Sequence, residues 1–151
     1  MHIEVDDLSR PEIHALLEEH LADMYATSPP ESVHALDVSA LVDPTITVWT
    51  LWEGGDLLGC VALKEHSPVD GEVKSMRTTA TARSRGVATQ LLGHLLDEAR
   101  RREYERVSLE TGSQDFFAAA RRLYLRHGFV ACGPFADYRV DPHSVYLTLA
   151  L

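Results

Sequence analysis

The sequence of 151 residues lacks the features that mark several protein classes. It has no apolar run near the ~20 residues that a membrane-spanning helix needs. Its first residues, MHIEVDD, carry an acidic pair in place of an apolar signal core. It also has no internal repeat, no low-complexity tract and no linker rich in Pro, Gly and Ser. We therefore expect one domain over residues 1–151, located in the cytoplasm and without a membrane partner.

Cysteine and positive charge are also scarce. The two cysteines, Cys60 and Cys132, form no metal-type pair and no disulfide framework, so we expect two small core residues in a reducing compartment. Lys and Arg total 14 against 23 Asp and Glu, and the net charge of −9 argues against nucleic acid as a partner. The eight histidines include no His-Glu-x-x-His pattern, so we expect no metal.

Hydrophobic periodicity predicts strands and helices in alternation. Ser9, Pro11 and Glu12 are typical of a helix start with Ser9 as N-cap, and apolar residues recur at helical spacing over residues 13–24. Amphipathic helices are also predicted from Val87 and over residues 116–127. Strands are predicted over residues 2–5, 45–52, 57–64, 72–79, 106–110, 130–138 and 145–151. This order predicts an α/β (α+β) fold, with a mixed central sheet of about six to seven strands and helices on both faces.

The most informative stretch, RSRGVAT, precedes the best-patterned helix. The first turn of a helix leaves backbone N–H groups unpaired at the positive end of the helix dipole, where a phosphate can bind. Gly86 and Ala88 leave room for it, while Arg83 and Arg85 add positive charge at the rim. The Walker and dinucleotide-binding glycine patterns are absent. These residues alone leave two interpretations open, a phosphate site and a plain helix start with solvated arginines.

Two motifs together resemble the GNAT family of N-acetyltransferases. Arg83-x-x-Gly86-x-Ala88 at a helix start is similar to its Arg/Gln-x-x-Gly-x-Gly/Ala signature. The segment ARRLYLRHGF, residues 120–129, is similar to its Ala-x-x-Leu-Tyr-x-x-x-Gly-Phe stretch. The tracts SPPESVHALD, KSMRT and SLETG also resemble the YsnE-type branch. The order of predicted elements agrees with the family fold along nearly the whole chain.

The resemblance implies acetyl-CoA as co-substrate. In the family, the pyrophosphate lies on the amides of the glycine turn, the pantetheine arm runs along the preceding strand, and the acetyl group lies where that strand splays. Carried over, the cofactor contacts are Met76, Arg77, Thr78, Arg83, Ser84, Arg85, Gly86, Val87, Ala88, Thr89 and Tyr124. Phe117 departs from the pattern, because many members carry an asparagine there that binds the pantetheine arm.

The resemblance also suggests catalytic candidates for attack of an amine on a thioester. An alkylammonium must first lose a proton, and a carboxylate can accept it. Glu72 matches a strand glutamate that serves as base in many members, and Glu110, at the end of the next strand, is the rival. Tyr124 matches the family tyrosine that often gives a proton to the leaving thiolate. A solvated carboxylate at Glu72 and a merely packed aromatic ring at Tyr124 remain alternatives.

The expected activity is transfer of an acetyl group to a primary amine of a small molecule or amino acid by direct attack. A non-catalytic acyl-CoA sensor and a protein N-terminal or lysine acetyltransferase remain as alternatives. In this fold, residues 24–34 and 134–144 would wall the acceptor pocket, where Lys74 and Arg77 can meet a carboxylate and Glu31 or Asp137 an ammonium. Sheet edges often pair in small domains, so a homodimer is compatible with the sequence.

Overall fold

The computed structural model describes all residues from Met1 to Leu151. The strands are β1 (His2–Val5), β2 (Ile46–Glu53), β3 (Asp56–Ser67), β4 (Asp70–Thr78), β5 (Arg106–Gly112), β6 (Val130–Cys132) and β7 (Ser144–Ala150). The α-helices are α1 (Pro11–Thr27), α2 (Val38–Leu41), α3 (Val87–Arg101) and α4 (Ala118–Arg126). Three short 3-10 helices are η1 (Pro30–Ser32), η2 (Ala80–Ala82) and η3 (Asp115–Phe117). No helix combines the length and the apolar character needed to cross a membrane.

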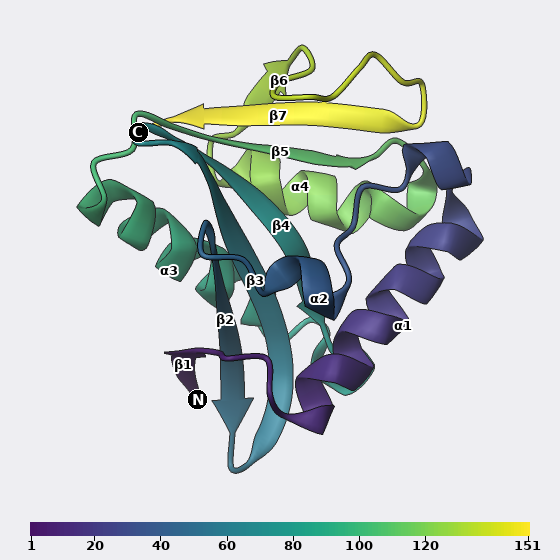
Figure 1. The fold of residues 1–151 in the computed structure, drawn as a ribbon. Helices are drawn as coiled ribbons and strands as arrows, with labels where there is room; N and C mark the ends of the chain where they lie inside the picture. The colour runs from purple at the N-terminus through teal and green to yellow at the C-terminus, as the bar shows by residue number, and fades with distance from the viewer.

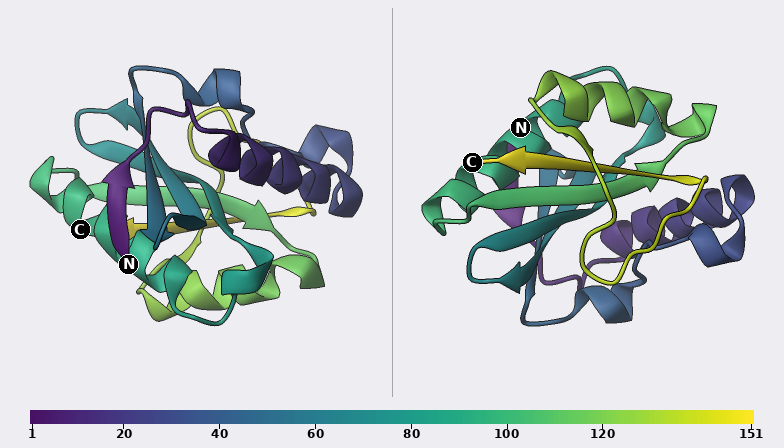
Figure 2. Two further views of the ribbon diagram at one scale, coloured as in Figure 1. Left: turned by 90° about the horizontal axis from the view of Figure 1, so that it is seen from below. Right: turned by 90° about the horizontal axis from the view of Figure 1, so that it is seen from above.

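The seven strands form one sheet in the order β1-β2-β3-β4-β5-β7-β6. Only the β4–β5 pair is parallel, and the other neighbours are antiparallel. Helices α1 and α2 lie on one face of the sheet, and α3 and α4 lie on the other (Figure 1, Figure 2). The predicted mixed sheet with helices on both faces is therefore confirmed.

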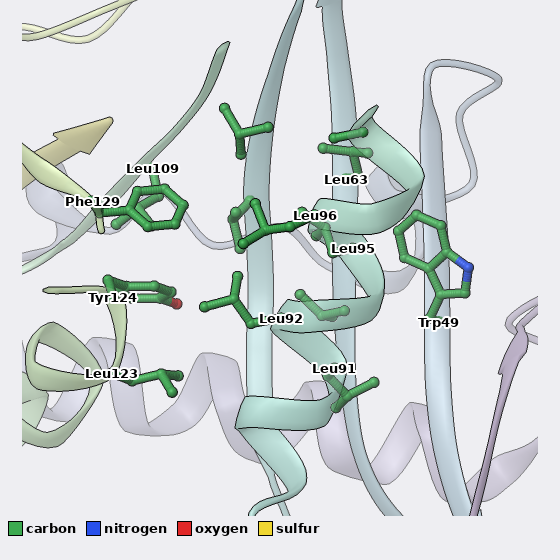
Figure 3. Packing of buried hydrophobic residues seen from close by; sticks show 14 of the residues in the cluster. Trp49, Leu63, Leu91, Leu92, Leu95, Leu96, Leu109, Leu123, Tyr124 and Phe129 are labelled. Carbon is green, nitrogen blue, oxygen red and sulfur yellow. The ribbon is translucent and has the colours of Figure 1, made fainter. Parts of the chain in front are cut away.

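The larger core lies between the sheet and the helices α3 and α4 (Figure 3). Helix α3 buries one continuous apolar face, because its apolar residues recur at the helical period: Val87, Leu91, Leu92, Leu95, Leu96 and Ala99. Complete burial of each leucine contributes about 1.5–3 kcal/mol. From α4, the ring of Tyr124 packs edge-to-face on Phe129, with 5.7 Å between their centroids. This packing holds α3 and α4 against the centre of the sheet.

A smaller core lies on the opposite face, under α1. Ile13, Leu16 and Leu17 of that helix pack with Val48 of β2 and Ala62 of β3. The same helix continues beyond this cluster toward the edge of β4, where it carries the partly exposed Met24. The smaller core therefore fixes the helix whose second half forms part of the site described below.

Three local predictions were wrong. The N-cap of α1 is Arg10, not Ser9, because the Ser9 hydroxyl donates to the Asp7 carboxylate at 2.6 Å. The strand predicted over residues 130–138 ends at Cys132, since Gly133 and Pro134 follow and proline has no N–H for a strand ladder. The helix predicted over residues 116–127 begins as a 3-10 turn and is α-helical only over Ala118–Arg126.

Candidate active site

Strands β4 and β5 separate in the middle of the sheet. Their ladder covers only Asp70–Glu72 against Arg106–Ser108, and beyond it the strands diverge (Figure 1). A bulge in β4 accompanies the divergence: Cys60 pairs with Arg77 and Ala62 with Lys74, so Ser75 and Met76 together oppose one residue of β3. Ser75 has the left-handed φ of 51° that this geometry requires. The sheet therefore opens next to the segment in which the acetyl group was predicted to lie.

A cavity of about 810 Å³ occupies this opening and reaches both faces of the sheet. On the side of α3 and α4 it is lined by Arg83, Gly86, Ala88, Arg122, Tyr124 and Arg126, which we call the α3–α4 chamber. On the side of α1 it is lined by His20, Met24, Ser28, Ser32, His34 and Lys74, which we call the α1 chamber. Of the predicted cofactor-binding and catalytic residues only Arg85 does not line the cavity, because its guanidinium turns outward and pairs with Glu53 at 2.9 Å.

The glycine turn opens the α3–α4 chamber. Gly86 has a φ of 79°, and a Cβ placed on it would meet no atom within 4 Å, so the space in front of α3 is free. No backbone N–H from Ser84 to Thr89 donates a hydrogen bond to another backbone group, and no side chain caps the helix. These amides and the dipole of a long helix suit a phosphate group.

Two arginines that the sequence prediction did not include extend the positive charge of this chamber. Arg122 and Arg126 line the cavity from α4, one helical turn apart on the same face. Their spacing of four residues was visible in the sequence, but the separation between α4 and the glycine turn was not. With Arg83 they place three guanidinium groups along the wall of the chamber.

Tyr124 reaches the opening from α4. It is 5% exposed, and Figure 3 shows its ring between Leu123 and Phe129, with the hydroxyl pointing away from α4. This hydroxyl has no hydrogen-bond partner in the chain, although the residue lines the cavity. Burial, followed by the charge of Glu110, raises the pKa of Tyr124 above its usual value of 10. The phenol therefore stays protonated throughout the neutral and moderately alkaline range.

Glu110 lines the cavity from β5, on the opposite side of the opening from β4. Its carboxylate belongs to no ion pair within 4 Å. Burial is the main cause that raises the pKa of Glu110 from 4.5 to about 7, while the Ser144 hydroxyl and the charge of Lys74 act in the opposite direction. A carboxyl group with such a pKa is well suited to accept a proton near neutral pH.

Glu72 differs from Glu110 although it lines the same cavity. It is only 2% exposed, and both of its oxygens are occupied. Oε1 lies 2.7 Å from Nε2 of His66, while Oε2 accepts the hydroxyl of Tyr138 at 2.5 Å and lies 3.4 Å from Nζ of Lys74. Glu72 is thus the centre of a buried polar network, and it is not the solvated strand-edge carboxylate that the sequence left open.

Hydrogen-bonded polar residues cover the α1 chamber, and we call this cover its roof. Residues from the segment after α1 line the chamber, as predicted for residues 24–34, but of residues 134–144 only His143 does, and neither Glu31 nor Asp137 reaches it. The hydroxyl of Ser32 donates to Asp141 at 2.6 Å, which ties the two segments together. Nζ of Lys74 donates to the carbonyl of His34 at 3.1 Å and to Tyr138 at 2.9 Å.

Phe117, the departure from the family pattern, fills the space next to the end of β5. A Cβ placed on Gly112 would lie 2.1 Å from Cδ2 of the Phe117 ring.

We therefore expect Gly112→Ala to lower the free energy of unfolding by about 1–3 kcal/mol through overpacking, measured by urea denaturation. Gly93→Ala is the matched control, because Gly93 lies in the interior of α3 with nothing within 4 Å of a new Cβ. It should stabilise the protein by up to about 1 kcal/mol, and equal effects of the two substitutions would contradict the packing argument.

Comparison with known proteins agrees with this geometry. Residues 13–129 match the Acetyltransferase (GNAT) family. The chain is 52% identical to the uncharacterized N-acetyltransferase YsnE of Bacillus subtilis (strain 168) over 151 residues, which is 100% of both chains. A proposed acyl-CoA N-acyltransferase from Klebsiella pneumoniae subsp. pneumoniae MGH 78578 superposes with a TM-score of 0.84 at 28% identity, covering 99% of this chain and 97% of that one.

A Bacillus subtilis acetyltransferase solved in complex with CoA has the same fold, with a TM-score of 0.73 at 18% identity, and the match covers 99% of this chain and 98% of that one. The resemblance to the family and to its YsnE-type branch is confirmed, and so is the expectation of an acyltransferase. The chain belongs to the GNAT family of acetyltransferases.

Proposed function

We propose that residues 1–151 act as one catalytic domain that moves an acetyl group from acetyl-CoA to a primary amine of a small molecule by direct attack. The observation that supports this most is the single cavity through the opening between β4 and β5. One end holds a glycine turn and three arginines, and the other end is a polar chamber of a different character. Donor and acceptor can therefore approach each other from opposite faces of the sheet.

The α3–α4 chamber would bind the CoA moiety. The free amides from Ser84 to Thr89 suit its pyrophosphate, and Arg83, Arg122 and Arg126 can contact its phosphates. The edge of β4 at Met76, Arg77 and Thr78 has no partner strand beyond Glu72, so its backbone can pair with an amide-containing arm. Direct attack is supported because neither Cys60 nor Cys132 lines the cavity as a nucleophile.

We assign the base to Glu110 in preference to Glu72. A base needs a free oxygen that can reach the amine, and Glu110 belongs to no ion pair, whereas both oxygens of Glu72 are occupied. A pKa of about 7 for Glu110 lets it accept a proton at neutral pH. Glu72 would instead hold Lys74 and Tyr138 in place.

The proton balance follows from these roles. As the C–N bond forms and the C–S bond breaks, the amine proton passes to the carboxylate of Glu110 and the Tyr124 hydroxyl gives its proton to the sulfur. Glu110 on β5 and Tyr124 on α4 both line the cavity at the opening. Solvent then restores both groups to their starting states.

A small acceptor is favoured over a protein terminus or lysine. The Ser32–Asp141 hydrogen bond and the Lys74–His34 hydrogen bond close a roof over the α1 chamber. An extended peptide needs an open groove in which its backbone can lie. A compact amine can enter a roofed chamber without separating these contacts.

The cofactor step is tested by calorimetric titration with acetyl-CoA. We expect Gly86→Trp to raise Kd at least about tenfold, which corresponds to ~1.4 kcal/mol, because the indole would cover the free amides. Gly55→Trp is the matched control, since Gly55 also has a positive φ, 89°, and open space around it, but lies in the β2–β3 turn. Equal affinities for the two variants would place the cofactor elsewhere. A screen of amines for release of free thiol then tests the transfer itself.

A further inference from the structure

Three polar atoms of residues that line the cavity are buried and have no hydrogen-bond partner in the chain. They are Nδ1 of His20, Oγ of Ser75 and Nε of Arg77, and all three residues line the cavity. His20 and Arg77 are only 9% and 7% exposed. Buried polar groups in proteins are normally paired. Three unpaired groups around one cavity indicate a subsite in which a ligand supplies the partner.

Arg77 is anchored from one side only. Its Nη2 group donates to Glu19 at 2.6 Å and to Asp23 at 2.5 Å, and these two carboxylates lie one turn apart on α1. The Nε–H group contacts neither of them and remains without a partner. Because the guanidinium is planar and rigid, fixing Nη2 also fixes the direction of the free N–H.

The chemistry of the free groups selects an anionic partner. An arginine side chain only donates hydrogen bonds, so its partner must be an acceptor, and hydrogen bonds to an ionised acceptor such as a carboxylate are roughly twice as strong as those between neutral groups. The Ser75 hydroxyl can donate as well. Burial, followed by the charge of Arg77, lowers the pKa of His20 to about 4. The ring is therefore neutral at pH 7 and offers one N–H.

The charge of the cavity agrees with this selection. Lys74 and Arg77 are the basic residues that line the acceptor side of the cavity, since Arg83, Arg122 and Arg126 belong to the α3–α4 chamber. The chain as a whole carries a net charge of −9. Glu19 and Asp23 offset the charge of Arg77, but their side chains are 49% and 37% exposed while that of Arg77 is 7% exposed. Water therefore screens the two carboxylates more than it screens the guanidinium.

We propose that the acceptor is an amine that also carries a carboxylate, and that Arg77 binds this carboxylate together with Ser75 and His20. This inference rests on the proposed acetyl transfer and adds the class of substrate, namely amino acids and related anionic amines. In this proposal Arg77 serves both substrates. Its backbone in β4 faces the donor, and its side chain on the α1 side of the sheet selects the acceptor.

The test compares three series of acceptors by thiol release: the L-amino acids, the carboxamide of each and the corresponding decarboxylated amines. We expect the best acceptor to be an acid, with kcat/KM at least about tenfold above that of its carboxamide, or ~1.4 kcal/mol. Carboxamides or decarboxylated amines that react as well as the acids overturn the substrate class while acetyl transfer stands. Thiol release with none of the series, despite binding of acetyl-CoA, also overturns it. Failure of the wild type to bind acetyl-CoA overturns the proposed function itself.

Variants of His20 separate recognition from packing. We expect His20→Leu to bring the ratio of acid to carboxamide activity toward 1, while His20→Asn, whose amide can place an N–H near the position of Nδ1, retains most of the ratio. Glu18→Gln is the matched control, because Glu18 is exposed on the same helix and does not line the cavity, and it should leave the ratio unchanged. Thermal midpoints and acetyl-CoA affinities establish that each variant is folded. An unchanged ratio in His20→Leu contradicts the assignment of His20.

Discussion

Glu110→Gln is expected to lower kcat by about 10²–10⁴-fold, the range typical for loss of a positioned general base. The glutamine is nearly isosteric, so acetyl-CoA affinity and the fold should be retained. Because the pKa of Glu110 is about 7, the ratio of wild-type to variant kcat should rise with pH through about 7 and then level off. The ratio is compared because the ionisation of the amine substrate affects the rates of both proteins equally and therefore cancels. A ratio that is independent of pH would exclude Glu110 as the base.

The same substitution should stabilise the protein. Burial raises the pKa of Glu110 above its ordinary value of 4.5, so between pH 4.5 and about 7 the native state binds more protons than the unfolded state. Stability then falls as the pH rises through this window, and the full cost is present above pH 7. Glu110→Gln removes this cost and should gain on the order of 1–3 kcal/mol at pH 8, measured by urea denaturation. At pH 4 the gain should disappear.

Glu72→Gln is the matched control for Glu110→Gln. Both oxygens of Glu72 are occupied by His66, Tyr138 and Lys74, so the substitution breaks a buried network and should lower the free energy of unfolding by about 1–3 kcal/mol. We expect kcat to fall less than about tenfold and to keep its dependence on pH near 7. If Glu72→Gln abolished this dependence while Glu110→Gln kept it, the two roles would be exchanged.

The sequence predicted the elements that rest on local pattern. The apolar period of α3 and Gly86 before it define both the helix and the turn, and the structure contains them as predicted. The strand predicted over residues 130–138 was wrong because its apolar content continued past Gly133 and Pro134. Segments that depend on distant partners, such as the short helix α2, gave no periodic signal.

The state of each site residue depended on contacts between distant parts of the chain. The sequence could rank Glu72 and Glu110 as candidate bases. It could not show that the hydroxyl of Tyr138, 66 residues away in the chain, donates a hydrogen bond to Glu72. Arg77 was expected to meet a ligand carboxylate, yet the carboxylates it contacts in the fold belong to α1, 58 and 54 residues earlier. Local pattern thus predicted residues that the structure places around one cavity, whereas tertiary contacts decided which of their polar groups remain unpaired.

Tyr124→Phe is expected to lower kcat by about 10²-fold, the lower end of the range for acid–base groups. The loss should be at this end because a thiolate is a good leaving group, its conjugate acid having a pKa near the value of about 8.5 for a cysteine thiol. Since the Tyr124 hydroxyl has no partner in the chain and its ring packs on Phe129, the variant should keep its thermal midpoint. Acetyl-CoA affinity should change less than about threefold, or ~0.6 kcal/mol.

Tyr104→Phe separates loss of a tyrosine hydroxyl from loss of catalysis. The Tyr104 hydroxyl donates to Glu65 at 2.7 Å and does not line the cavity, so this control should lose about 1 kcal/mol of stability and keep its kcat. The opposite pattern is expected for Tyr124→Phe, because burial and the charge of Glu110 raise the pKa of Tyr124 and so keep its phenol protonated as a donor. If Tyr124 instead only positions the sulfur, KM for acetyl-CoA will rise and kcat will fall less than about tenfold.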